Sequence, residues 1–121
     1  MSIDHVSIKV TDYAASKAFF TTALAPLGCV PEEEGPACGF GHAGRPDFWI
    51  AAGERHLPLH IAFAAASHEQ VREFYRAALE AGGRDNGAPG LRANYQPDYY
   101  AAFVYGPDGH NIEAVCRAPQ A

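Results

Sequence analysis

Residues 100–115 form two apolar runs around a turn: Tyr-Ala-Ala-Phe-Val-Tyr-Gly-Pro-Asp-Gly-His-Asn-Ile-Glu-Ala-Val. In the turn, Gly106–Gly109, proline fixes φ, aspartate bonds the local backbone and glycine accepts a positive φ. The β-prone residues on both sides predict a β-hairpin. Its second strand carries Glu113 between two apolar residues. Because a buried and unpaired carboxylate is costly, Glu113 needs solvent, a cationic partner or a metal ion.

The chain contains an internal repeat with an offset of 55 residues. Each half begins with an alternating strand, at residues 3–10 and 58–65, and continues with an amphipathic helix. Five pairs share this offset: His5 and His60, Asp12 and Ser67, Phe19 and Phe74, Leu24 and Leu79, Gly28 and Gly83. A β-α-β-β-β unit covers only one face of its sheet, so two units must pair. We expect a single domain over residues 1–121, made of module 1 (about 1–54) and module 2 (about 57–121).

Local signals place the remaining elements. Asp12 is the expected N-cap of a helix over residues 13–25, and Ser67 with Gln70 forms a capping box before the second helix. Strands are expected near residues 28–32, 37–42 and 46–52. The last two form the hairpin that closes the first half. Aligning the two hairpins places Trp49 at the position that Glu113 occupies in the second half.

Composition limits the class of protein. The chain has 48% hydrophobic and 19% charged residues, which is typical of a globular domain, and a net charge of −5. This charge disfavours nucleic acid and anionic membranes as partners. No apolar run is long enough to span a bilayer, and the N-terminus has no signal-peptide pattern. Three cysteines without a CxxC pair favour free thiols and a cytoplasmic location.

Three potential metal ligands fall on matching strand faces. His5, His60 and Glu113 each lie on the face opposite the apolar, helix-covered one. Two imidazoles and a carboxylate suit a divalent cation, with Zn, Ni, Mn and Fe equally compatible, and leave positions open for water or substrate. The alternative is that both histidines are structural or surface residues and that Glu113 is an exposed edge-strand carboxylate.

The repeat, the two strand-opening histidines and Gly-Pro-Asp-Gly-His-Asn-Ile-Glu-Ala-Val at residues 106–115 resemble the vicinal-oxygen-chelate superfamily. That superfamily includes glyoxalase I, fosfomycin-resistance thiol transferases, extradiol dioxygenases, methylmalonyl-CoA epimerase and bleomycin-binding proteins. The resemblance implies an α+β fold in which two βαβββ modules form a curved mixed-sheet cup around the metal. It also implies a small-molecule substrate and a homodimer, with metal ligands often shared between two chains.

The sequence departs from glyoxalase I at one point. Glyoxalase I has a fourth ligand, a glutamate, on the last strand of its first module, and this chain has Trp49 at or next to that position. The resemblance therefore implies a metal-dependent lyase, isomerase or transferase other than a standard glyoxalase I. Two alternatives remain. One is a metal-free protein that binds a small molecule or antibiotic, as bleomycin-resistance proteins do. The other is a metal-free relic in which the ligands form a hydrogen-bonded polar cluster.

Residues 84–100 are the expected specificity loop, because they combine turn residues with groups that bind polar organic molecules. An equally weighted alternative is a packed connector whose tyrosines cover the edge of the sheet. The expected substrate-binding residues are Trp49, Arg92, Tyr95, Tyr99 and Tyr100. Tyr100 and Tyr105 are candidate hydrogen-bond donors in catalysis. The sequence identifies no general base.

Overall fold

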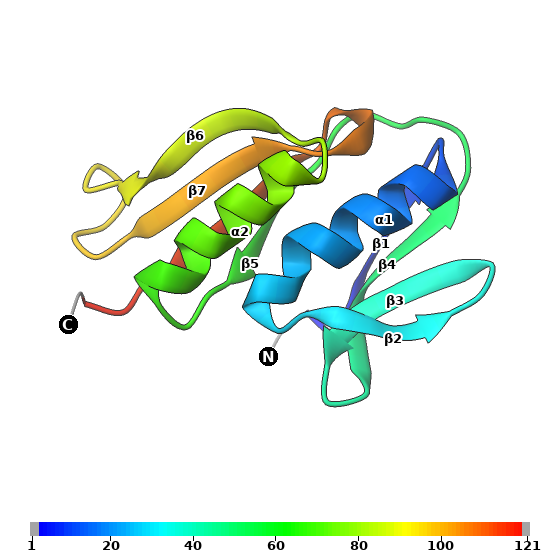
Figure 1. The fold of residues 1–121 in the computed structure, drawn as a ribbon, viewed down its shortest axis with the longest axis horizontal. Helices are drawn as coiled ribbons and strands as arrows, with labels where there is room; N and C mark the ends of the chain where they lie inside the picture. The colour runs from blue at the N-terminus through cyan, green and yellow to red at the C-terminus, as the bar shows by residue number, and fades with distance from the viewer. Residues whose placement is uncertain (1–2, 120–121) are drawn as a thin grey trace.

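The computed structural model describes residues 3–119 and contains two modules of the same design (Figure 1). Module 1 comprises β1 (Val6–Val10), α1 (Tyr13–Leu24), β2 (Val30–Glu34), β3 (Ala37–His42) and β4 (Arg45–Ala52). Module 2 comprises β5 (His60–Ala64), α2 (His68–Glu80), β6 (Arg84–Leu91), β7 (Tyr100–Tyr105) and β8 (Asn111–Cys116). Short 3₁₀ helices, η1 (Ala25–Leu27) and η2 (Pro107–Gly109), follow α1 and β7. The predicted α+β fold of two βαβββ modules is confirmed.

Each module has a four-stranded mixed sheet, in the order β1-β4-β3-β2 or β5-β8-β7-β6. The first strand pairs in parallel with the last, and the other pairs are antiparallel. In module 1, Ser7 lies opposite Trp49. In module 2, Ala62 lies opposite Glu113. Because Ser7 and Ala62 are related by the 55-residue offset, Trp49 and Glu113 occupy equivalent positions, as the aligned hairpins predict.

Side-chain caps begin both helices as the sequence predicts. The Asp12 carboxylate accepts a hydrogen bond of 3.0 Å from the backbone N–H of Ala15. The Ser67 hydroxyl oxygen accepts one of 3.1 Å from the N–H of Gln70, and the Gln70 side chain accepts one of 2.7 Å from the N–H of Ala66. These bonds satisfy N–H groups that have no partner within the helix.

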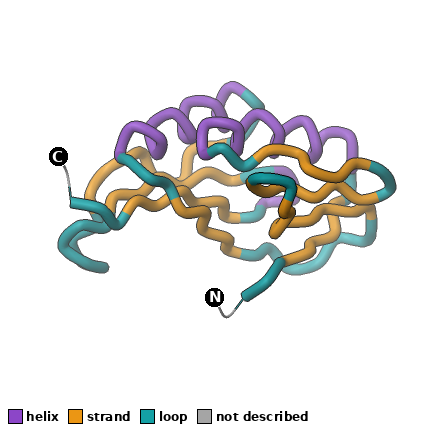
Figure 2. Tube along the Cα trace, turned by 90° about the horizontal axis from the view of Figure 1, so that it is seen from below, coloured by secondary structure: helices purple, strands orange, loops and turns teal. Residues whose placement is uncertain are grey.

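Both helices lie on one side of the two sheets and pack against each other (Figure 2). The modules share one apolar core beneath them. The rings of Phe48 in β4 and Phe63 in β5 meet edge to face at 5.3 Å. Phe19 of α1 lies so close to module 2 that a Cβ at Gly83 would stand 2.9 Å from its ring. Neither helix in the described part of the chain is long and apolar enough to cross a membrane.

The segment predicted as a loop over residues 84–100 is partly a strand. Residues 84–91 form β6, which pairs with β7 through an irregular register around Gly87. Its glycines and proline have low strand propensity, so the sequence does not predict a strand here. Proline donates no hydrogen bond to a neighbouring strand, but it is tolerated in an edge strand such as β6. The segment between β6 and β7 is therefore limited to residues 92–99, which we call the covering segment.

The turn at Gly106–Gly109 is present, but its aspartate has a different partner from the one expected. The N–H of Gly109 donates to the carbonyl of Gly106 at 3.1 Å, and Gly109 has φ +80°. The Asp108 carboxylate does not bond its own turn. It accepts 2.9 Å and 2.6 Å hydrogen bonds from the N–H and hydroxyl of Thr11 in module 1. The hairpin of module 2 is thus fastened to the start of α1.

Candidate functional site

Glu113 lies in a hydrogen-bonded cluster with His60 and Tyr99. Only 1% of the Glu113 side chain is exposed, whereas 54% of the His60 side chain is exposed. One carboxylate oxygen of Glu113 lies 2.7 Å from His60 Nε2, and the other accepts a 2.5 Å hydrogen bond from the Tyr99 hydroxyl. The buried carboxylate therefore has two polar partners, and the cluster reaches solvent through the imidazole.

The fold brings these residues together by strand alternation. His60 and Ala62 share one face of β5, and Ala62 lies opposite Glu113 in β8. Because Ala62 is small, the imidazole of His60 can reach the carboxylate. On the other side of β8, Phe103 lies opposite Glu113, with its ring 6.1 Å from that of His60. His60 and Glu113, predicted to share a face, are in contact.

The last residue of the covering segment (residues 92–99) lies against Glu113. Tyr99 packs on a small cluster of Ala101, Phe103 and Val115. The Arg117 guanidinium stands over the Tyr99 ring, 4.9 Å from its centre. Burial, followed by the hydrogen bond to Glu113, raises the pKa of Tyr99 to about 12. The phenol therefore remains protonated near neutral pH and acts as a donor to the carboxylate.

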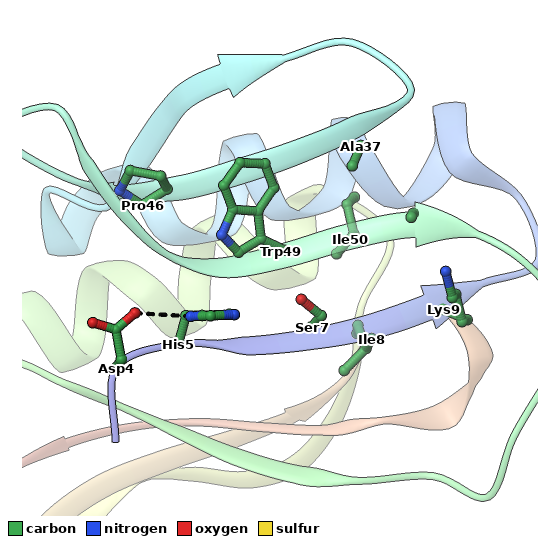
Figure 3. Close-up of a pocket in the computed structure, with 10 residues that line it drawn as sticks. Asp4, His5, Ser7, Ile8, Lys9, Ala37, Pro46, Trp49 and Ile50 are labelled. Carbon is green, nitrogen blue, oxygen red and sulfur yellow. Dashed lines mark hydrogen bonds and ion pairs between the residues drawn. The ribbon is translucent and has the colours of Figure 1, made fainter. Parts of the chain in front are cut away.

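The equivalent face of module 1 holds an open cavity of about 550 Å³ (Figure 3). Trp49 projects into it from β4, and His5, Ser7 and Lys9 line it from β1 and the residue before that strand. His5 Nδ1 lies 2.8 Å from a carboxylate oxygen of Asp4. The cavity thus has an aromatic side chain opposite Ser7 and is bounded by polar side chains along β1.

A second cavity, of about 580 Å³, separates residues 3–6 from β5. His5 and His60 both line it, and His5 lines the cavity of Figure 3 as well. The structure therefore brings the two predicted histidine ligands to one cavity, and Glu113 adjoins His60. Across residues 3–119, however, no three His, Cys, Asp or Glu side chains form a group that could hold a metal ion. His5 stands outside the His60–Glu113 contact.

Arg92 and Tyr95, both expected to bind substrate, lie in the covering segment. The Arg92 guanidinium donates 2.8 Å hydrogen bonds to the carbonyls of Gly90 and Ala88 and lies 5.3 Å from the centre of the Phe103 ring. These contacts tie Arg92 to its own chain. Tyr95 is 57% exposed, and its ring meets that of Tyr99 edge to face at 5.1 Å. Tyr95 thus remains available to a ligand.

The two tyrosines considered for catalysis lie away from Glu113. Tyr100 faces α2, where its ring stacks on His68 at 3.9 Å and its hydroxyl accepts a 3.3 Å hydrogen bond from Arg72. Tyr105 is the last residue of β7, and the Arg84 guanidinium lies 5.3 Å from the centre of its ring. The residue that reaches Glu113 is instead Tyr99, one position before β7.

Sequence reasoning missed the part that Ser7 and Lys9 play in the module 1 cavity. The signal was present, because strand alternation places both on the same face as His5. Gly39 was also missed. It lies opposite Trp49, and a Cβ there would stand 2.9 Å from the indole. No sequence pattern marks a glycine that makes room for an aromatic ring on the neighbouring strand.

The chain belongs to the Glyoxalase/Bleomycin resistance protein/Dioxygenase superfamily, whose family model matches residues 2–114. The predicted membership is thereby confirmed. Among curated proteins, none matches the chain.

Solved structures with the same fold support this assignment. A glyoxalase/bleomycin resistance protein from Albidiferax ferrireducens T118 is 27% identical, with a TM-score of 0.82 over 98% of this chain and 100% of that chain. A putative glyoxalase from Bacillus halodurans is 24% identical, with a TM-score of 0.71 over 95% of both chains. A protein named oxidase ChaP-H1 is 20% identical, with a TM-score of 0.70 over 98% of this chain and 97% of that chain. The last two show similarity of fold alone.

Proposed function

We propose that this protein is a divalent-metal-dependent enzyme of the superfamily, a lyase, isomerase or transferase acting on a small substrate with two neighbouring oxygens. It would not be a standard glyoxalase I, because Trp49 stands at the position equivalent to Glu113. One observation carries the proposal. A carboxylate with 1% exposure is held in contact with the Nε2 atom of a half-exposed histidine.

The donor set of this cluster fits a divalent cation. An imidazole nitrogen and a carboxylate oxygen suit Zn, Ni, Mn or Fe. His60 and Glu113 would hold the ion, with His5 as the third ligand. Tyr99 would retain its hydrogen bond to the second carboxylate oxygen, and so fix the orientation of the group that binds the metal.

The chain's own residues would prepare the site for chemistry. When bound, a divalent ion acts as a Lewis acid that polarises substrate oxygens. Tyr99 contacts the Glu113 carboxylate, which is only 1% exposed, and burial of this kind strengthens electrostatic interactions at the carboxylate. His60 remains exposed at the edge of the second cavity, where it can meet both the ion and an incoming substrate.

We further propose a homodimer, in which His5 completes the site in its own chain or in the second one. Exposed apolar side chains support an interface between two chains. They are Ile3 at 68%, Leu57 at 85%, Leu59 at 41% and Leu91 at 55% exposure. A cytoplasmic location accords with three free and buried cysteines: Cys29, Cys38 and Cys116.

Metal content and thermal stability test the metal site. Protein purified without chelator should contain close to one divalent ion per site. At a concentration of 100 times Kd, that ion should stabilise the fold by about 2.7 kcal/mol. His60→Ala and Glu113→Gln should abolish both effects. His68→Gln is the control, since this histidine lies on α2 against Tyr100 and lines neither cavity. Wild-type protein that contains no metal, and whose melting temperature ignores EDTA, Zn²⁺, Ni²⁺, Mn²⁺ and Fe²⁺, would refute the proposal.

The second candidate is a small-molecule or antibiotic-binding protein that performs no chemistry. One observation favours it: both oxygens of the Glu113 carboxylate are engaged by protein side chains, one by His60 and the other by Tyr99. In that case the melting temperature would respond to an organic ligand and not to metal ions. Melting temperatures measured by differential scanning calorimetry, with and without EDTA, distinguish the two candidate functions.

A further inference from the structure

The module 1 cavity contains an aromatic side chain, Trp49, that is packed against the neighbouring strand. Trp49 lies opposite Gly39 in the β3–β4 pair. A Cβ at Gly39 would stand 2.8 Å from Pro46 and 2.9 Å from two atoms of the indole. The six-membered part of the indole therefore lies across bare backbone, between β3 and Pro46. This packing restrains the ring while part of it still lines the cavity (Figure 3).

One charged side chain that lines this cavity, Lys9, has no ion-pair partner among residues 3–119. The only carboxylate that lines it, on Asp4, is engaged by His5 at 2.8 Å. No ion pair within residues 3–119 involves the Lys9 ammonium. Its stem lies against Gly53, where a Cβ would stand 2.9 Å from Lys9 Cδ. The cavity thus presents a cation, although the whole chain carries a net charge of −5.

The strand register gives the spacing between Trp49 and Lys9, and this spacing limits the size of a ligand that contacts both. Ser7 lies opposite Trp49, and Lys9 lies opposite Ala51 two residues further along the same face. At a rise of about 3.3 Å per residue, the backbone positions of Trp49 and Lys9 are therefore offset by about 6.6 Å along the strands. Ala51 pairs in turn with Ala37, so small side chains line the path between the indole and the ammonium.

We propose that this cavity binds a planar aromatic ligand that carries a carboxylate, with its ring against Trp49 and its carboxylate beside Lys9. Aromatic rings gain from offset stacking on an indole, and an ammonium favours a carboxylate over a neutral group. The proposal goes beyond the proposed function, because it assigns a ligand to a cavity on the module 1 face that contains neither His60 nor Glu113. On the equivalent face of module 2, Tyr99 packs on Ala101, Phe103 and Val115, and its hydroxyl donates to Glu113.

Fluorescence of the single tryptophan reports directly on this cavity, since Trp49 is the only one in the chain. The probe is 4-methylbenzoate, compared with 4-methylbenzyl alcohol, which lacks the charge, and cyclohexanecarboxylate, which lacks the aromatic ring. We expect a saturable change in emission with 4-methylbenzoate and a much weaker response to the other two. Lys9→Met should weaken 4-methylbenzoate binding about fivefold. It should leave binding of the alcohol unchanged.

Two further variants make the outcome decisive. Lys17→Met is the matched control, because Lys17 lies on α1 and pairs with Glu34. It should bind 4-methylbenzoate as the wild type does. Glu113→Gln should also retain binding, so that loss of the metal site and loss of this cavity are separate results. No saturable response, equal affinity in wild type and Lys9→Met, or binding that requires a divalent metal would each overturn the proposal.

Discussion

Removing one hydroxyl from Tyr99 should destabilise the protein measurably. In Tyr99→Phe, one oxygen of the Glu113 carboxylate loses its 2.5 Å donor while the side chain remains 1% exposed. Hydrogen bonds to charged groups contribute about 1.5–3 kcal/mol, and a buried acceptor left without its partner carries a desolvation penalty of that order. For a domain of this size, this loss lowers the melting temperature by about 5–15 °C.

Denaturant unfolding of Tyr99→Phe beside Tyr95→Phe tests this reasoning. Tyr95 lies in the same segment, is 57% exposed, and its hydroxyl has no hydrogen-bond partner in the described chain. Tyr95→Phe should therefore change the free energy of unfolding by less than about 0.5 kcal/mol. In the Glu113→Gln background, Tyr99→Phe should cost less than in the wild type, because the acceptor is no longer charged. Equal stability of the two tyrosine variants would refute the reasoning.

The same hydrogen bond gives a pH dependence of known sign. Because the pKa of Tyr99 is raised in the folded protein to about 12, its contribution to stability is complete below the unfolded value of about 10. That contribution is lost as the pH rises through the folded value. The stability difference between wild type and Tyr99→Phe should be constant up to about pH 10 and should narrow above it. A difference that stays constant through pH 12 would contradict this assignment.

Three other changes test the fold. Asp108→Asn keeps a residue that tolerates a positive φ but removes the charge that accepts two bonds from Thr11, so chemical denaturation should show a loss of about 1–2 kcal/mol. Burial alone would raise the pKa of Asp108, but the hydrogen bonds from Thr11 oppose it and the pKa is lowered. The stability difference between wild type and Asp108→Asn should therefore disappear as the pH falls below about 4. Gly39→Ala forces a Cβ to within 2.9 Å of Trp49 and should cost about 1–3 kcal/mol, with a shifted tryptophan emission. Ser67→Ala removes the cap of α2 and should lower the melting temperature through a loss of about 1 kcal/mol.

The features of this protein that could be predicted from its sequence are those marked by a regular spacing of residues. Strand alternation and the 55-residue offset placed His60 and Glu113 on one face before any contact between them was known. The caps at Asp12 and Ser67 follow from hydrogen bonds that span three residues. Such signals do not depend on how the modules meet, and they were confirmed by the structure.

The remaining features depend on contacts that no local period encodes. Alternation cannot be carried through the covering segment, so the sequence could not show that Tyr99 reaches Glu113 while Tyr100 faces α2. The bond from Thr11 to Asp108 joins residues 97 positions apart. The strand at residues 84–91 is held by its neighbour β7 in spite of its glycines and proline, which makes it a product of tertiary structure.

The shared core has a consequence for how a repeat of this kind can arise. Phe19 of the first half fills space beside Gly83 of the second, and Phe48 meets Phe63 across the boundary. A half expressed alone would expose these surfaces to water. An ancestral gene that encoded one half would therefore have needed a second copy of its product to fold against. Fusion of two such genes converts an association that depends on concentration into an intramolecular one, and frees each half to change its open face independently.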